Sequence, residues 1–125
     1  MRIVGGQHRG RKLLSPEGLG TRPTKDSTRE SLFNILAHAG WLPGPILDSA
    51  QILDAFAGTG ALGLEALSRG GSHAVFIEHD RRAADTCRQN IAALKEENRT
   101  VIITADATSM PPRPHNIAPR TLVFL

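Results

Sequence analysis

Apolar and polar positions follow two different periods along the second half of the chain. Short, continuous apolar runs at residues 52–56, 74–78, 101–104 and 121–125 predict buried strands. Between the first three runs, apolar residues recur three and four positions apart, which is typical of amphipathic helices. Strands that alternate with helices predict an α/β fold with a parallel, doubly wound sheet of about four strands.

Two helices are expected between these strands, at residues 61–68 and from Asp80 to about residue 95. Gly70 follows the first helix closely enough to end it, and Asp80 is a residue type that caps helix starts. Cys87 lies on the apolar stripe of the second helix, so we expect it to fill the core and not to act as a nucleophile.

The first half of the chain has weaker patterns. Short apolar pieces at 2–4 and 11–14, separated by glycines, predict a small hairpin. Ser27 followed by Glu30 matches a capping box, which predicts a helix that ends near Gly40.

Composition places this chain of 125 residues among ordinary globular proteins of one compact domain. A single cysteine excludes an internal disulfide, and the sequence shows neither a secretory signal nor an apolar run long enough to span a membrane. These features predict a cytoplasmic protein. The five histidines are scattered without ligand spacing, so no metal site is expected.

Positive charge is concentrated at the N-terminus. Residues 1–30 contain seven basic and three acidic residues, whereas the rest of the chain contains eight basic and nine acidic residues. A basic segment suits a polyanion such as RNA, because neutralised phosphates release counterions. A solvated basic arm without a partner would give the same count.

A glycine-rich turn joins the strand at 52–56 to the helix at 61–68. Gly58, Gly60 and Gly63 satisfy the spacing G-x-G-x-x-G, which several classes of cofactor-binding protein share. The turn lacks the lysine and hydroxyl residues of a nucleoside-triphosphate loop, so that ligand class is disfavoured.

Three carboxylates accompany successive strands. Asp54 lies in the first strand, Glu78 ends the second and Asp106 follows the third, and the carboxyl ends of such strands form the ligand edge of the sheet. Glu78 also suits a dinucleotide, since it follows Gly58 by 20 residues. Asp54 would repel a pyrophosphate, whereas a ligand with an ammonium group, a ribose and an adenine fits all three acids. S-adenosylmethionine is such a ligand, although each acid alone also fits a turn cap or a surface charge.

Four segments together resemble the bacterial 16S ribosomal RNA guanine-N2 methyltransferases: "MRIVGGQHRGRKL", "TRPTKDSTRESLFNIL", "FAGTGALGLEALSRG" and "FIEHDRRAADTCRQN". The resemblance covers nearly the whole chain. It implies a Rossmann-like methyltransferase fold that depends on S-adenosylmethionine, with small-subunit ribosomal RNA as the partner. It also implies a basic RNA-binding arm over residues 1–25 and a partial methyltransferase domain over residues 26–125.

Carried over residue by residue, the resemblance implies two binding sets. Asp54, Phe56 and the loop from Ala57 through Gly58 and Thr59 to Gly60 would hold the methionine part of the cofactor, Glu78 its ribose, and Asp106 with Ala107 its adenine. RNA phosphates would contact Arg9, Arg11, Lys12, Arg22 and Arg29.

One family motif is missing from these residues. Members carry Asp-Pro-Pro-Tyr/Phe after the fourth strand, where it accepts hydrogens of the guanine amino group, but here the sequence stops at Leu125. We therefore expect a truncated member that is weak or inactive, and we name no catalytic residue. A fragment of a nicotinamide-dependent oxidoreductase and a non-catalytic RNA-binding module remain as alternatives.

Overall fold

The computed structural model describes residues 1–15, 25–42, 44–110 and 112–125. Its helices are α1 (Asp26–His38), α2 (Ala61–Ser68) and α3 (Arg81–Ala93), with short 3-10 turns η1 (Glu97–Arg99) and η2 (Ala107–Ser109). Its strands are β1 (Gln51–Asp54), β2 (His73–Glu78), β3 (Thr100–Thr104) and β4 (Leu122–Phe124). In the ranges described, no helix has the length and apolar character that a membrane span needs.

The strands form one parallel sheet in the order β3-β2-β1-β4. Ile52 of β1 is paired with Ala74 of β2 on one side and with Leu122 of β4 on the other. The chain therefore adds β2 and β3 on one side of β1 and then returns to add β4 on the other side. The α/β fold class and the sheet of four parallel strands are confirmed, and the fourth strand lies beside the first.

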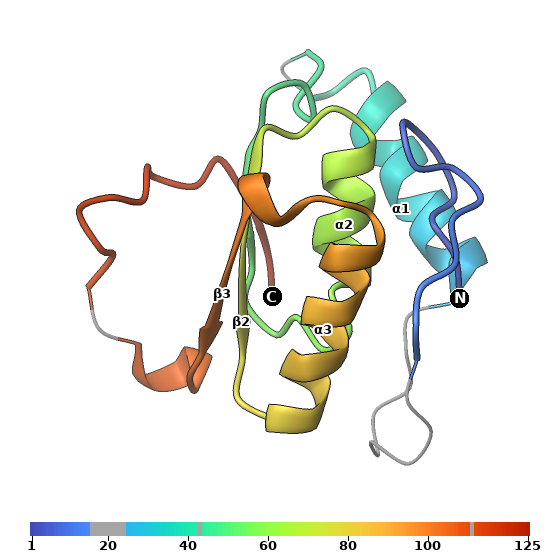
Figure 1. Cartoon of the computed structure of the whole chain (residues 1–125). Helices are drawn as coiled ribbons and strands as arrows, with labels where there is room; N and C mark the ends of the chain where they lie inside the picture. Colours follow the sequence, from blue (N-terminus) through green and yellow to red (C-terminus); the bar gives the residue numbers. More distant parts are fainter. Residues whose placement is uncertain (16–24, 43, 111) are drawn as a thin grey trace.

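Helices cover one face of the sheet, and the segment between β3 and β4 runs along the other (Figure 1). Ile52, Leu64 and Phe76 are fully buried between the sheet and the helices. On the opposite face Val75 and Ile77 pack against Ile117. The carboxyl ends of the strands point toward the lower side of Figure 1, where α3 begins and η2 lies.

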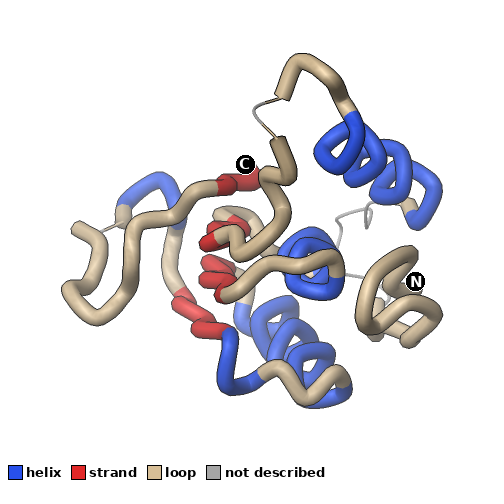
Figure 2. The backbone as a smooth tube through the Cα atoms, turned by 90° about the horizontal axis from the view of Figure 1, so that it is seen from above, coloured by secondary structure: helices blue, strands red, loops and turns tan. Residues whose placement is uncertain are grey.

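The N-terminal hairpin packs on the outer side of α2, away from the sheet (Figure 2). Arg2 and Lys12 form its antiparallel bridge, and the Ile3 and Leu13 side chains are buried in the same core as α2. The hairpin is therefore confirmed, and it is part of the packed structure. The division of the chain after residue 25 stays a prediction.

The two predicted helix starts have different outcomes. The Asp80 carboxylate accepts the Ala83 N–H at 2.9 Å and caps α3 as expected. The capping box at Ser27 is wrong, because α1 begins at Asp26 and no side chain caps it. The Asp26 carboxylate instead accepts hydrogen bonds from the Arg2 N–H and the Arg29 guanidinium.

Strand β4 is an edge of the described sheet. Val123 in this strand and Leu125 directly after it are 45% and 93% exposed. Unpaired N–H and C=O groups beside apolar side chains are a template for pairing with another chain. We predict that the 125-residue polypeptide self-associates at micromolar concentration, measured by size exclusion with light scattering. Val123→Lys should reduce the association. A single monomeric peak for the unmodified chain would contradict this prediction.

Candidate functional site

Glu78 connects two turns at the carboxyl edge of the sheet. Its Oε1 accepts the Gly58 N–H at 2.7 Å, and its Oε2 accepts the Asp80 N–H at 2.8 Å. The glycine turn after β1 is thus held against the start of α3. Each carboxylate oxygen keeps a second lone pair, so the half-buried Glu78 side chain can still accept hydrogen bonds from a ligand.

The glycine turn has little side-chain bulk. Gly58 and Gly60 adopt positive φ values of 55° and 85°, a region that favours glycine. A Cβ at Gly60 would lie 2.7 Å from the Cys87 Sγ, whereas a Cβ at Gly58 would meet no atom within 4 Å. Cys87 therefore supports the turn from within the core, and burial raises the pKa of its thiol to about 12. Its predicted core role is confirmed.

Asn90 fixes the turn from α3 and was missed by sequence reasoning. Its fully buried amide donates to the Thr59 carbonyl at 2.9 Å and to the Leu14 carbonyl at 3.2 Å, and its Oδ1 accepts the Leu14 N–H at 2.7 Å. The amide thus joins the glycine turn to the N-terminal hairpin. The sequence signal that could have indicated this role is a polar residue on the buried stripe of the helix.

Asp54 lies behind the glycine turn, which revises its predicted direct contact with the cofactor. The side chain is 2% exposed, and its Oδ2 accepts the Gly63 N–H at 3.1 Å. Burial raises the pKa of this carboxyl to about 6, and the negative charge of Glu78 adds to the shift. Asp54 therefore positions the turn through α2.

Asp54→Asn should change the pH dependence of stability. The carboxyl has a folded pKa of about 6 against about 4 in the unfolded chain, so wild-type stability falls as pH rises between these values. Asparagine keeps an acceptor for Gly63 and does not titrate. We expect the variant to gain about 1–3 kcal/mol relative to wild type at pH 8 and much less at pH 4. Urea denaturation at both pH values measures this difference, and an equal difference at both would contradict it.

Asp106 and Ala107 begin the turn that follows β3. The exposed Asp106 carboxylate accepts the Thr108 N–H at 2.9 Å and the Thr108 hydroxyl at 2.6 Å, and these bonds lower its pKa. Because Glu78 is paired with Thr104, the last residue of β3, Asp106 follows the neighbouring strand two residues beyond the level of Glu78. Ala107 lines an apolar pocket of about 310 Å³ with Ile77 and other residues of the helix-free face.

The predicted RNA contacts fall into three groups. Arg9, Arg11 and Lys12 are exposed on the hairpin, where the Arg11 guanidinium also donates to the Ala93 carbonyl at 2.6 Å. Arg22 lies outside the described residues. Arg29 is 0% exposed and pairs with Asp26 and Glu65, so the prediction that it meets RNA phosphates is wrong in this structure.

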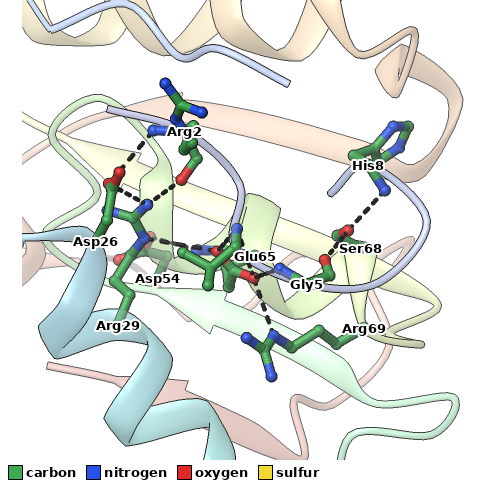
Figure 3. A network of polar contacts seen from close by, with 11 residues as sticks. Arg2, Gly5, His8, Asp26, Arg29, Asp54, Glu65, Ser68 and Arg69 are labelled. Carbon is green, nitrogen blue, oxygen red and sulfur yellow. Dashed lines mark hydrogen bonds and ion pairs between the residues drawn. The ribbon is translucent and has the colours of Figure 1, made fainter. Parts of the chain in front are cut away.

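Glu65 is the centre of a buried polar network that the sequence reasoning missed (Figure 3). The 0% exposed carboxylate accepts the Val4 and Gly5 N–H groups at 3.0 Å each. It also pairs with Arg69 at 2.9 Å and with Arg29 at 3.6 Å. The network joins the hairpin, α1 and α2. An acid inside the otherwise apolar segment "ALGLEALS" was the signal that could have indicated it.

A parallel sheet with a glycine turn after its first strand and acids at successive strand ends has the architecture of the Rossmann-like methyltransferases, and the structural comparisons agree. The fold is similar to that of a putative methyltransferase, yhhF, from Escherichia coli, with a TM-score of 0.71 and 44% identity over 86% of this chain and 53% of that one. It is also similar to a putative methylase from Haemophilus influenzae, with a TM-score of 0.64 and 34% identity over 92% of this chain and 57% of that one.

The chain belongs to the family described as conserved hypothetical protein 95, whose model matches residues 1–125. It is 47% identical over 119 residues to ribosomal RNA small subunit methyltransferase D of Escherichia coli K12, covering 94% of this chain and 57% of that protein. It is 39% identical to the putative rRNA methyltransferase YlbH of Bacillus subtilis, covering 86% of this chain and 54% of that protein. The chain thus spans little more than half the length of these relatives.

Proposed function

We propose that this chain is the cofactor-binding part of an S-adenosylmethionine-dependent enzyme that methylates guanine N2 in small-subunit ribosomal RNA. The observation that carries the proposal is the contact between Glu78 and the glycine turn at 2.7 Å, with Asp106 beyond the neighbouring strand. This arrangement brings residues from three parts of the chain to one edge of the sheet, where α/β proteins bind ligands.

The residues at this edge fit the chemistry of the cofactor. A Cβ at Gly58 would project into open space, so the backbone of the turn is accessible to a ligand. Glu78 has lone pairs left for ribose hydroxyls, and the exposed Asp106 can accept from an exocyclic amine. When bound, S-adenosylmethionine supplies a sulfonium methyl group. The chain's own residues hold the donor and exclude water from one side of it.

Charge at the edge favours this cofactor over a dinucleotide. Asp54 lies directly behind the turn, Glu78 accepts a hydrogen bond from it, and Asp106 follows the neighbouring strand β3 at the same edge of the sheet. Three carboxyl groups along this edge disfavour a pyrophosphate and favour a cationic ligand. A nicotinamide dinucleotide is therefore a less suitable ligand for this edge than S-adenosylmethionine.

The RNA substrate is supported by two observations. The Escherichia coli relative is named as a ribosomal RNA small subunit methyltransferase, and the Bacillus subtilis relative as a putative rRNA methyltransferase. Arg9, Arg11 and Lys12 are exposed on the hairpin and can neutralise phosphates. The guanine N2 position comes from the family resemblance, and no group among residues 1–125 is assigned as the acceptor of the amine hydrogens.

A methyl-transfer assay tests the proposal. Because the chain spans 57% of the Escherichia coli relative, we would join residues 1–125 to the part of that relative beyond the matched region. The chimera should transfer tritium from labelled S-adenosylmethionine to small-subunit rRNA and yield N2-methylguanosine after digestion. Methylation of another base would refute the guanine N2 assignment. RNA binding without cofactor binding would support the non-catalytic module instead.

A further inference from the structure

The buried side chain of Asn90 connects two parts of the chain to which the proposed function gives different ligands. It is 0% exposed in α3, and it bonds to the Thr59 carbonyl in the glycine turn that is proposed to hold the cofactor. It also bonds to the backbone of Leu14, two residues after Lys12 of the basic hairpin. One side chain therefore contacts the backbone of both proposed binding sites.

The hydrogen bonds of this amide use both of its donors. One N–H donates to the Leu14 carbonyl at 3.2 Å and the other to the Thr59 carbonyl at 2.9 Å, while Oδ1 accepts the Leu14 N–H at 2.7 Å. An amide group is planar, so its oxygen and its two N–H groups move together. A displacement of Leu14 that turns the amide therefore also turns the donor away from Thr59.

Exposed cations lie directly before this contact in the chain. Arg11 and Lys12 are exposed, and the Arg11 guanidinium also donates to the carbonyl of Ala93, the last residue of α3, at 2.6 Å. RNA phosphates bound by these two side chains would restrain the segment that ends at Leu14. A restrained Leu14 holds the Asn90 amide in the orientation that donates to Thr59, so the cofactor then binds to a turn that is already ordered.

We propose that Asn90 couples the two binding events, so that RNA on the hairpin raises the affinity of the glycine turn for the cofactor. Bound cofactor then raises the affinity for RNA by the same factor, because coupling between two sites is reciprocal. The inference rests on the proposed function and deepens it by assigning a positioning residue that is buried away from both ligands. The coupling favours loading of the methyl donor on a protein that already contacts RNA.

The experiment measures the affinity of the 125-residue chain for S-adenosylhomocysteine by calorimetry, first alone and then with saturating oligouridine at one fixed salt concentration. The ratio of the two dissociation constants is the coupling factor. S-adenosylhomocysteine lacks the sulfonium charge, so attraction between that charge and RNA phosphates does not contribute. Asn90→Ala removes every hydrogen bond of the amide. Gln89→Ala is the matched control, because Gln89 is the exposed neighbour on the same helix.

Wild type and Gln89→Ala should bind S-adenosylhomocysteine at least about fivefold more tightly when oligouridine is present. In Asn90→Ala the coupling factor should fall to within about twofold of unity, even where the affinity for each ligand alone is reduced. An asparagine that only stabilised the fold would change the affinity equally with and without RNA. The coupling factor would then stay as in wild type, so it separates the two roles.

Hydrogen exchange on wild type provides a second test, which decides the matter if Asn90→Ala does not fold. The Gly60 N–H donates to the Ala57 carbonyl at 2.8 Å within the glycine turn, and Gly60 is buried. Oligouridine without cofactor should slow the exchange of this amide, because RNA on the hairpin orders the turn through Asn90. Unchanged exchange at Gly60 in the RNA-bound protein would overturn the inference.

Two calorimetric results would overturn the inference and leave the proposed function intact. One is a coupling factor of unity in a wild type that binds both ligands. The other is a coupling factor that persists in Asn90→Ala, which would mean that the ligands influence each other without this side chain. A wild-type chain that fails to bind either S-adenosylhomocysteine or RNA would overturn the proposed function and the inference together.

Discussion

Replacing Glu65 with alanine is expected to lower the free energy of unfolding by about 3–5 kcal/mol, a large part of the stability of a small domain. The carboxylate is fully buried, and the substitution leaves the guanidinium groups of Arg29 and Arg69 without this partner. It also leaves the Val4 and Gly5 N–H groups without their acceptor. Urea denaturation measures the loss. Hydrogen exchange should show that the Val4 and Gly5 amides lose protection first.

Glu30→Ala is the matched control for this prediction. Glu30 lies on α1 and is exposed, so the same substitution should change stability by no more than about 0.5 kcal/mol. Glu65→Gln should lie between the two, because glutamine keeps an acceptor for one N–H group but loses the charge. If Glu65→Ala behaved like Glu30→Ala, the buried network of Figure 3 would not hold the hairpin onto α2.

Gly63→Ala is expected to destabilise the protein by about 2–4 kcal/mol, although alanine normally stabilises a helix interior by up to about 1 kcal/mol relative to glycine. A Cβ at Gly63 would lie 2.3 Å from the Phe76 Cε1 and 2.8 Å from its Cζ. The Phe76 ring is fully buried, so α2 and β2 must separate. A loss of stability, where a helix normally gains stability from alanine, would show that close contact with Phe76 requires glycine at this position. Thermal denaturation measures the change in stability.

Gly58→Ala separates this clash from backbone strain. Gly58 has a positive φ of 55° but open space at its Cβ position, so only the cost of the left-handed conformation, about 1–2 kcal/mol, should appear. Gly63→Ala should also disturb the bond from the Gly63 N–H to Asp54 and therefore the shape of the glycine turn. A Gly63→Ala variant as stable as wild type would show that α2 and β2 do not pack as described.

Local patterns were enough to predict the elements of the second half of the chain. Helix α2 occupies residues 61–68 as predicted, and Asp80 caps α3. Both features depend on neighbours within a few residues: apolar spacing in the first case and a side-chain bond to the Ala83 N–H in the second. The parallel direction of the strands also followed, because strands that alternate with helices favour a parallel sheet.

Contacts between distant parts of the chain were beyond such patterns. Arg29 looked like a surface cation, but tertiary packing places it against Glu65. Asp54 looked like a ligand contact, but its depth in β1 directs it to Gly63. In both cases the charged residue is easy to see in the sequence. Whether its side chain is buried depends on contacts with residues more than eight positions away in the chain. The pairing of Glu78 with the glycine turn was likewise not deducible from spacing alone.

The most direct test of whether carboxylates at the strand ends select the cofactor is calorimetry of the chain with S-adenosylmethionine and with NAD. The same measurements are repeated on a double variant that combines Glu78→Gln with Asp106→Asn. These substitutions keep side-chain shape but remove the charge and one acceptor oxygen from each side chain, and Glu97→Gln, on the exposed turn before β3, is the control. We predict that wild type and control bind S-adenosylmethionine and not NAD, and that the double variant loses at least about tenfold in affinity, since a hydrogen bond to a charged group is worth about 1.5–3 kcal/mol. Unchanged affinity in the double variant, or binding of NAD alone by wild type, would contradict the account.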